Sequence, residues 1–561
     1  MWDNIGTSSD DHFKQHAQKA AFERGERLLS TQSINADASS LNSGGDRNGG
    51  GSPEAKAFGQ ADVAVVVDEA EGRKWLSWRL LWLYTGPGWL MSIAYVDPGN
   101  IESDLQSGAY TGYQLLWVLF WSTALGLLLQ MLAARLGVAS GLNLAQACRR
   151  GYSRPISLAI WVAIELAIIG SDVQEVIGSA YAFKLLFGWP LWVGCLVTGL
   201  DTFTFLGIHY FGVRKLESFF VLLIAIMVAG FGANFVQSKP EWAAIGVGTA
   251  VPRLPRYGVV QAVSTVGAVI MPHNIYLHSA LVQSRAVDRS SDAAIAVGIK
   301  YNSIESGVAL LVSFLINASV ICVFAKYWFD AGCAGLDGGP FAKEPTWAPG
   351  SACDDGQVHG GQCCINIGLA EGGDALQGVL GSKARLFWAI GLLAAGQSST
   401  MCGAFAGQFV MEGFLDIKVA VWKRVAVTRS IALVPAIAVG ILAERTSKHV
   451  ADLLDEWINV EQSVLLPFAL LPVLLFCSNE KYMGAFALGP WQRGFTWLCA
   501  LLVLVINFYL AWSTIDSLLP HSPLVYAVAA VVAALYAAFV VVICIDKQPW
   551  YARLRGSMKS T

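Results

Sequence analysis

The chain has 561 residues, of which 55% are hydrophobic and only 14% are charged, and its mean hydropathy is +0.50. Soluble globular domains contain about 25% charged residues, so this composition excludes that class and indicates a protein that lies in lipid. The net charge of −3 says little about partners, and the sequence contains nothing that resembles the basic stripe of a nucleic-acid-binding protein.

Long apolar stretches recur along the chain from residue 80 onward. About twelve of them can cross a bilayer, because a transmembrane helix needs about 20 residues. The sequence therefore predicts an all-α polytopic membrane protein. The predicted spans are 80–108, 113–136, 155–186, 190–211, 213–236, 259–282, 301–324, 386–415, 425–442, 453–476, 495–512 and 524–545.

The spans divide the chain into segments of different composition. Residues 1–75 are rich in Ser, Gly, Asn and Asp and are predicted to form a disordered cytosolic tail, because such a segment buries too little apolar area to fold. The other predicted segments are 76–236 with spans one to five, 237–480 with spans six to ten, 481–545 with spans eleven and twelve, and a cytosolic tail at 546–561.

Positive charges fall in alternate loops between the predicted spans. Short cytosolic loops retain Lys and Arg during insertion, so these loops and both termini are predicted to be cytosolic. Arg253 and Arg256, which precede span six, lie on the opposite face and are an exception. The cytosolic set is Arg149, Arg150, Arg154, Arg214, Lys215, Arg285, Arg289, Lys300, Lys418, Lys423, Arg424, Lys481, Arg493, Arg553, Arg555 and Lys559.

The long polar segment at about 328–383, here called the cysteine loop, is predicted to be extracytosolic. It contains Cys333, Cys353, Cys363 and Cys364. Disulfide bonds are expected in such a compartment, with free thiols as the alternative, and the sequence does not define their pairing. A zinc site is disfavoured because the spacing lacks paired CxxC units.

Two predicted spans contain residues that break helices. Pro98 and Gly99 interrupt span one, and Pro272 interrupts span six. Proline removes a backbone donor, and the carbonyl and amide groups freed at this depth need a cavity, protein groups or a ligand as partners. One broken helix at the start of each half is typical of an inverted-repeat transporter with its site at the midplane.

The side chains at the two breaks suit a transition-metal ion. Asp97 supplies a carboxylate, Asn100 an amide oxygen, Ala268 a backbone carbonyl and Met271 a thioether sulfur. Oxygen ligands alone would suit Mg²⁺ or Ca²⁺, whereas a thioether favours a softer metal. The alternative is that Met271 fills the core and Asp97 caps a helix.

Three acidic residues of span three point to proton movement. Glu165, Asp172 and Glu175 follow one another at helical spacing and are predicted to share one face. Ionisable residues inside a span are costly and usually line a polar path. The alternative is that these acids form buried pairs that hold neighbouring helices.

Several motifs resemble the Nramp family of proton-coupled divalent-metal transporters. The resemblance runs from about Trp82 to the end of span ten, is weaker in spans eleven and twelve, and leaves out the N-terminal tail and the cysteine loop. The matching motifs are GPGWLMS at 86–92, DPGN at 97–100, GSDVQEVIGS at 170–179, MPHN at 271–274, AGQSST at 395–400 and NVEQS at 459–463.

The resemblance implies a LeuT-like fold in which spans one to five are related to spans six to ten by an inverted repeat. It implies that Asp97, Asn100, Met271 and the Ala268 carbonyl bind the metal, and that Gln462 of span ten approaches in some conformations. It assigns the acidic face of span three to the proton route. His273 would lie beside the metal site, and Arg429 of span nine would be a charge partner.

The predicted function is therefore proton-coupled import of Mn²⁺, Fe²⁺ and other late divalent metal ions toward the cytosol by alternating access. The alternatives are a metal-sensing membrane receptor without transport and a sodium-coupled small-solute symporter of the same fold. An enzyme is disfavoured, since the sequence has no P-loop, nucleophile elbow or HExxH helix. The expected partners are metal ions, protons and the bilayer, with no cofactor and no obligate protein partner. Plasma, vacuolar and endosomal membranes all fit the sequence.

Overall fold

The computed structural model describes residues 63–64, 76–209, 213–336, 339–349, 351, 353, 356–417, 421–445, 449–518 and 523–545. All of them belong to one compact unit, Ala57–Thr561. Apart from residues 63–64, the predicted N-terminal tail lies outside the described residues, as does the predicted C-terminal tail. Val63–Ala64 form a short strand, β1, which pairs in parallel with β2 at Arg285–Ala286.

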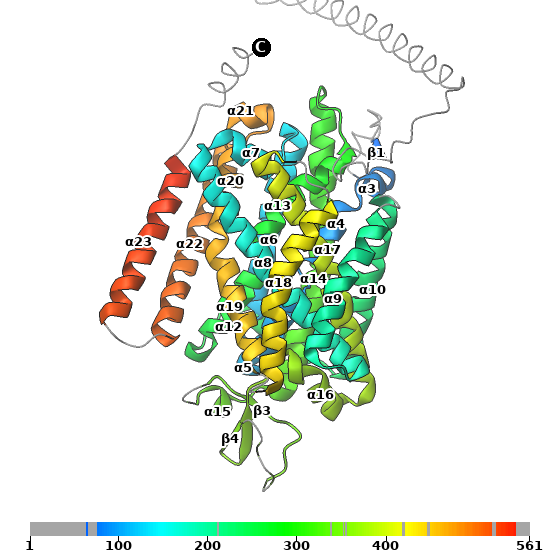
Figure 1. Cartoon of the computed structure of the whole chain (residues 1–561), viewed down its shortest axis with the longest axis vertical. Coiled ribbons are helices and arrows are strands. Elements are labelled where there is room, and N and C mark those ends of the chain that lie inside the picture. The colour runs from blue at the N-terminus through cyan, green and yellow to red at the C-terminus, as the bar shows by residue number, and fades with distance from the viewer. Residues whose placement is uncertain are drawn as a thin grey trace, which may run out of the picture. The chain divides into compact units, whose positions relative to one another are not determined.

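The described part of the unit is a bundle of helices (Figure 1). Every predicted span has a helical counterpart within the described residues. In chain order these are α4 (Pro87–Ile93) with α5 (Pro98–Thr111), α6 (Leu116–Ser140), α8 (Arg154–Phe187), α9 (Leu191–His209), α10 (Val213–Gln237), α12 (Val259–Val269) with α13 (Pro272–Leu281), α14 (Asp292–Trp328), α17 (Ser382–Leu415), α18 (Val421–Arg445), α19 (His449–Leu465) with α20 (Pro467–Cys477), α22 (Pro490–Leu518) and α23 (Pro523–Ile545).

Eight helical stretches of the described residues are by themselves long and apolar enough to cross a membrane. One of them, Pro98–Ser140, joins the second half of span one to span two. Span six falls short because it is broken into α12 and α13. Span eight is a 34-residue helix, α17, whose middle carries the polar run 397–400.

Span ten consists of α19 and α20, with the single turn residue Leu466 between them and Pro467 as the first residue of α20. The backbone of Leu466 stays helical, with φ of −53° and ψ of −39°, and Val450–Cys477 forms one 28-residue apolar stretch. Proline removes one hydrogen bond of the helix here without unwinding it, unlike the extended backbones at Asp97 and Met271.

Several shorter elements lie wholly or partly outside the predicted spans. They are α3 (Trp78–Tyr84), α7 (Leu144–Gly151), α11 (Trp242–Ala250), α15 (Ala331–Ala334), α16 (Leu369–Leu380), α21 (Glu480–Met483) and the 3₁₀ turns η1 (Gly112–Leu115), η2 (Arg256–Gly258), η3 (Val282–Ser284) and η4 (Gly484–Phe486).

The cysteine loop contains a small antiparallel sheet with the strand order β3-β5-β4. Its strands are β3 (Ala342–Lys343), β4 (Gly356–His359) and β5 (Gln362–Ile365). Disulfide bonds join Cys333 to Cys364 and Cys353 to Cys363. The sheet lies at the end of the bundle that is lowest in Figure 1, here called the loop face.

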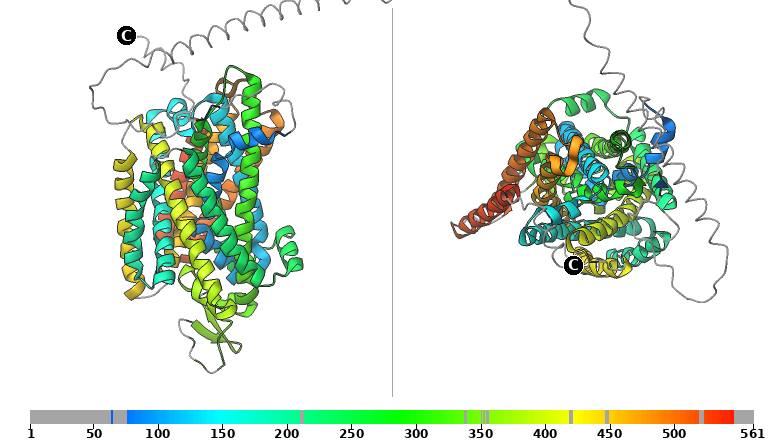
Figure 2. Two further views of the ribbon diagram at one scale, coloured as in Figure 1. Left: turned by 90° about the vertical axis from the view of Figure 1, so that its right-hand side faces the viewer. Right: turned by 90° about the horizontal axis from the view of Figure 1, so that it is seen from above.

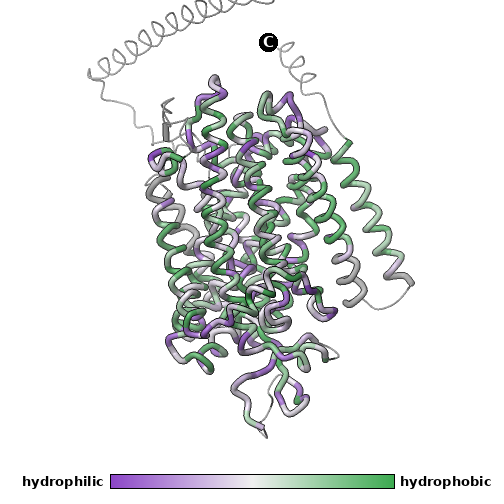
Figure 3. The backbone as a smooth tube through the Cα atoms, turned by 180° about the vertical axis from the view of Figure 1, so that it is seen from behind, coloured by the Kyte–Doolittle hydropathy of each residue, from purple (hydrophilic) through white to green (hydrophobic). Residues whose placement is uncertain are grey.

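The helices form an inner group and an outer group. The broken helices α5 and α12 lie inside, where α5 packs against α14 and α8, and α12 packs against α19. Helices α22 and α23 lie side by side at one edge (Figure 2) and are apolar along most of their length (Figure 3). Leu498 and Leu535 on these two helices are 65% and 66% exposed. Large apolar surfaces of this kind are expected where helices face lipid.

Candidate metal-binding site

Span one breaks because Asp97 caps the second helix segment instead of continuing the first. Asp97 has an extended backbone, with φ of −75° and ψ of 171°, and its Oδ1 accepts a hydrogen bond from the Asn100 backbone N at 2.9 Å. Pro98 occupies the first helical position, which needs no N–H donor. Gly99 follows, and a Cβ there would lie 2.8 Å from Gln174 Oε1, so only glycine lets α5 approach α8 this closely.

Span six breaks at Ile270 and Met271. In a continuous helix the carbonyl of Ala268 would accept a hydrogen bond from residue 272, but Pro272 has no N–H. Helix α12 ends at Val269, Met271 has an extended backbone and α13 starts at Pro272. The sequence therefore leaves the Ala268 carbonyl available to a partner outside its own helix.

The two breaks meet in the protein interior. Asn100 Nδ2 lies 2.6 Å from Asp97 Oδ1 and 2.9 Å from the Ala268 carbonyl oxygen, and it donates to both. Asp97 and Asn100 are each 1% exposed. Within the described part of the chain, Asp97 Oδ2 and Asn100 Oδ1 have no hydrogen-bond partner. Two buried oxygens without donors are costly, and a cation is a ligand that would satisfy both.

Met271 and Gln462 occupy different positions relative to these oxygens. Met271 lies three residues beyond Ala268 in the same break and is 2% exposed. Gln462 is directed toward α8, because its Nε2 donates to the Ala167 carbonyl at 2.7 Å. The structure thus brings Asp97, Asn100 and the Ala268 carbonyl together, places Met271 at the adjacent helix start, and leaves Gln462 engaged elsewhere.

The donor set is unlike that of a zinc or calcium protein. No group of three or more His, Cys, Asp or Glu side chains that could hold a metal occurs among the described residues. A site at the two breaks would combine one carboxylate with an amide oxygen, a backbone carbonyl and a thioether. Such a mixture of oxygen donors and a soft sulfur donor suits a transition metal better than Mg²⁺ or Ca²⁺.

The acidic residues of α8 pair with two arginines of α18. Arg429 NH2 lies 3.5 Å from Asp172 and 3.3 Å from Glu175 and also donates to the Thr400 carbonyl. Glu165 pairs with Arg424, at 3.1 Å. The three acids of the predicted face therefore all form ion pairs. Arg429 pairs with Asp172 and Glu175, whereas Glu165 pairs with Arg424.

Arg424 is a functional candidate that sequence reasoning missed. The run Lys418, Lys423 and Arg424 was interpreted as a cytosolic loop, but Arg424 is 5% exposed and contacts Glu165 from inside the bundle. Arg424 directly precedes a span predicted to begin at residue 425, and this position was the sequence feature that could have indicated its burial.

His273 is 3% exposed, and its Nδ1 has no hydrogen-bond partner in the described part of the chain.

A polar network that was not predicted holds the breaks in place. Asn459 Nδ2 reaches the Gly99 carbonyl at 3.4 Å and Ser264 Oγ at 2.9 Å. Gln174 Nε2 donates to Asn459 Oδ1 at 3.0 Å. Helices α5, α8, α12 and α19 are thus joined beside the site. Asn459 and Gln174 belong to motifs that carry the family resemblance, but their roles depend on how the helices pack.

A second network, here called the latch, fixes the start of α4. The backbone N–H of Gly86 donates to Glu305, and Arg285 NH2 lies 2.7 Å from Glu217 and 2.6 Å from the Thr85 carbonyl. Gly86 has φ of 147°, and a Cβ there would collide with the side chains of Glu217 and Arg285. The latch joins the first half of span one to α10 and α14.

Comparisons with known proteins agree on one family. Residues 88–513 match the Nramp family profile, described as natural resistance-associated macrophage protein-like. The chain is 49% identical over 440 residues to a metal transporter nramp1 homolog of Dictyostelium discoideum, covering 78% of this chain and 76% of that protein. It is 47% identical to metal transporter Nramp3 of Arabidopsis thaliana, covering 77% and 80%.

Solved structures give the same result for the fold. A manganese transporter of Eremococcus coleocola, crystallised as a point mutant, superposes with a TM-score of 0.71 at 28% identity, covering 87% of this chain and 98% of the other. The predicted all-α polytopic fold with broken helices one and six is confirmed. The relatives are transporters and not enzymes. The chain is a member of the Nramp family of metal transporters and an integral multi-pass membrane protein.

Proposed function

We propose that the chain is a proton-coupled secondary transporter that carries Mn²⁺, Fe²⁺ and other late divalent metal ions toward the cytosol by alternating access. The observation that carries the proposal is a pair of buried oxygens, Asp97 Oδ2 and Asn100 Oδ1, for which the described residues supply no hydrogen-bond partner; they lie beside the Ala268 carbonyl. The ion and the protons are substrates, and no resident cofactor is needed.

Mn²⁺ and Fe²⁺ fit this site better than Mg²⁺ or Ca²⁺ do. Met271 offers a soft sulfur donor that hard cations do not favour. The name of the Eremococcus coleocola neighbour, a manganese transporter, supports manganese as one substrate here. Asp97 must be deprotonated to bind the ion well, so acid and metal are expected to compete at this carboxylate.

Asn100 is proposed to change its role when the ion binds. In the structure its amide nitrogen donates to Asp97 Oδ1 and to the Ala268 carbonyl. A cation bound to the Asp97 carboxylate and the Ala268 carbonyl would displace the amide nitrogen from the carbonyl oxygen. Rotation of the amide would then turn Oδ1 toward the ion, so that the residue changes from donor to ligand.

Alternating access is proposed from the closure of the site on both sides. Asp97, Asn100, Ala268 and Met271 are all at most 2% exposed, so an ion can neither reach them nor leave without movement. The latch around Gly86 holds the first half of span one against α10 and α14, and the Asn459 network holds α5, α12 and α19 together. We infer that both must loosen when the site opens. Rocking of broken helices against the rest of a bundle is the usual way in which such sites open in turn.

Protons are proposed to move along the paired acids Asp172, Glu175 and Glu165. Ion pairs of this kind can also be purely structural, and a proton-driven uptake assay separates the two roles.

Both termini are proposed to be cytosolic, from the distribution of Lys and Arg.

The test is Mn²⁺ uptake into proteoliposomes that contain the full chain. An acidic exterior is expected to accelerate uptake, an excess of Ca²⁺ is expected to leave it unchanged, and Asp97→Ala is expected to abolish it. Absence of uptake under every gradient would favour a metal-sensing receptor. Uptake driven by Na⁺ instead of protons would favour the sodium-coupled alternative.

A further inference from the structure

An elongated apolar pocket lies beside the metal site, on the outer side of α12. Its volume is about 600 Å³, and α6, α12 and α22 form its walls. The floor includes Val263 and Ile270, each 1% exposed, whereas Trp121 and Leu502 at the rim are 61% and 60% exposed. The pocket is therefore open to the surroundings of the bundle and closed toward its interior.

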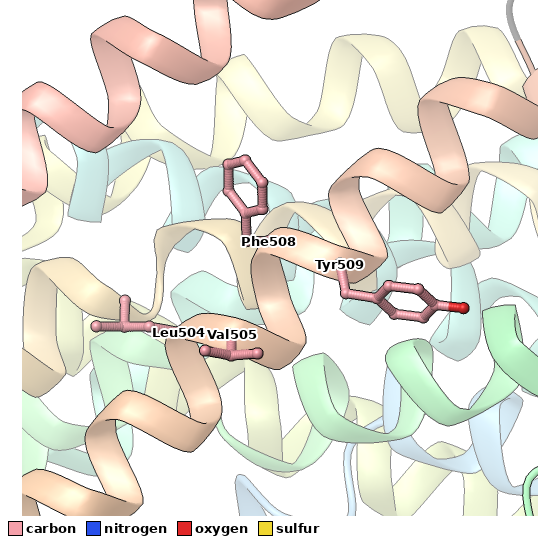
Figure 4. Close-up of a pocket in the computed structure, with 4 residues that line it drawn as sticks. All are labelled: Leu504, Val505, Phe508 and Tyr509. Carbon is pink, nitrogen blue, oxygen red and sulfur yellow. The ribbon is translucent and has the colours of Figure 1, made fainter.

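The pocket has the length of an acyl chain in one leaflet. Its lining residues on α6 run from Trp117 to Leu128. Eleven residues of helix rise by about 16 Å, and one leaflet of the hydrocarbon core is about 15 Å thick. A second apolar hollow of about 550 Å³ extends the surface along α22, and Tyr509 lines both (Figure 4).

Positive charge lies at the end of this pocket that is nearer the loop face. Leu254 lines the pocket, and its neighbour Arg253 accepts a hydrogen bond from Trp117 Nε1 through its carbonyl at 3.0 Å. Arg256 begins η2, the turn that leads into α12. Both arginine side chains are exposed, and neither forms an ion pair with any described residue. These two arginines are also the exceptions to the charge distribution of the other loops.

We propose that this pocket, here called the lipid pocket, binds one phospholipid, with an acyl chain between α6, α12 and α22 and the phosphate on Arg253 and Arg256. Arginine is well suited to a phosphodiester because its planar guanidinium donates two parallel hydrogen bonds. The apolar lining and the paired cations thus match the two parts of one ligand.

The lipid pocket is placed to act on the metal site. Helix α12 presents Ala262, Val263 and Val266 to the pocket. It presents Ser264, Thr265 and the Ala268 carbonyl to α5 and α19, where they form hydrogen bonds. Ile270, at the inner end of the pocket, directly precedes Met271. A bound chain would therefore support the helix that carries two proposed metal ligands at its end.

The test uses the full chain in phosphatidylcholine nanodiscs with a phosphatidylcholine that carries a photoreactive group in its acyl chain. Cross-linked peptides are identified by mass spectrometry. We expect labelling to concentrate on 117–128 and 262–270. We expect Arg253→Gln with Arg256→Gln to reduce it about tenfold, because glutamine is uncharged and cannot make the paired, charge-assisted hydrogen bonds of a guanidinium to the phosphate. This double variant leaves the apolar core untouched and keeps the test informative.

A second part of the experiment fills the lipid pocket with a larger side chain. Val266→Trp should abolish the preferential labelling, whereas Leu501→Trp should not, because Leu501 is 57% exposed on α22 and lines neither hollow. Labelling spread evenly over α22 and α23, or preferential labelling by a photoreactive sterol, would overturn the proposal. The readout is binding, so it remains decisive even if the proposed transport activity is wrong.

Discussion

Asn100 joins the two broken spans, since its side-chain amide donates to the Ala268 carbonyl with 2.9 Å between Nδ2 and the oxygen. The same nitrogen lies 2.6 Å from Asp97 Oδ1. One donor thus bridges the Asp97 carboxylate and the Ala268 carbonyl, so the two buried acceptors lie close together without repelling each other.

Replacing Asn100 by Ala should therefore weaken metal binding. The variant loses one ligand and the link between α5 and α12, and we expect Mn²⁺ affinity to fall at least about tenfold, which corresponds to about 1.4 kcal/mol. Titration calorimetry measures this directly. Asn302→Ala is the matched control, because Asn302 is also buried but bonds within its own helix, to Gly298. Equal affinities in both variants would contradict the assignment.

Met271→Ala tests the contribution of the thioether. Without sulfur the remaining oxygen donors should discriminate less between Mn²⁺ and Ca²⁺, so we expect Ca²⁺ to become an effective competitor of Mn²⁺ uptake. Met227→Ala, which removes a fully buried methionine from α10, should leave the selectivity unchanged. Unaltered competition in Met271→Ala would remove the argument for a soft donor.

Gly86→Ala should disrupt the latch. The positive φ of Gly86 is unfavourable for alanine, and the added Cβ would displace Glu217 and Arg285. We expect a lower melting temperature in detergent. Gly232→Ala in α10 is the control, since a Cβ there meets nothing within 4 Å and alanine favours a helix. A Gly86→Ala protein as stable as Gly232→Ala would show that the latch tolerates the added atom.

Arg429→Ala removes the counter-charge shared by Asp172 and Glu175. Leaving buried charges unpaired costs about 3–5 kcal/mol, whereas an exposed pair contributes about 0–1 kcal/mol. We expect a large fall in melting temperature and loss of the response of uptake to a pH gradient. Arg385→Ala, which breaks an exposed pair with Asp374, should change neither. A destabilised variant that retains a full pH response would indicate a structural role alone.

The breaks of spans one and six were predictable because their chemistry is local. Pro98 and Pro272 stand beside polar residues in otherwise apolar runs, so the sequence itself identifies the positions. The prolines of spans nine and ten are different, since Pro435 and Pro472 lie inside helices and Pro467 follows a residue with a helical backbone. Packing as well as local sequence therefore decides which prolines unwind a helix.

Pairings between distant helices were beyond sequence reasoning. Arg424 and Glu165 are separated by 259 positions, and Arg424 lies next to residues that are ordinary for a cytosolic loop. The contacts of Asn459 and Gln174 likewise depend on the rotation of α19 and α8 about their axes. The donor types at the metal site could be predicted, whereas the exchange of hydrogen bonds through Asn100 required the structure.

The most direct test of the metal site is anomalous scattering from crystals of the full chain grown with Mn²⁺. The account predicts a peak in contact with Asp97, Asn100, the Ala268 carbonyl and Met271, with no such peak in Asp97→Ala crystals. A manganese peak elsewhere in the protein, with the oxygens of Asp97 and Asn100 still unoccupied, would contradict it.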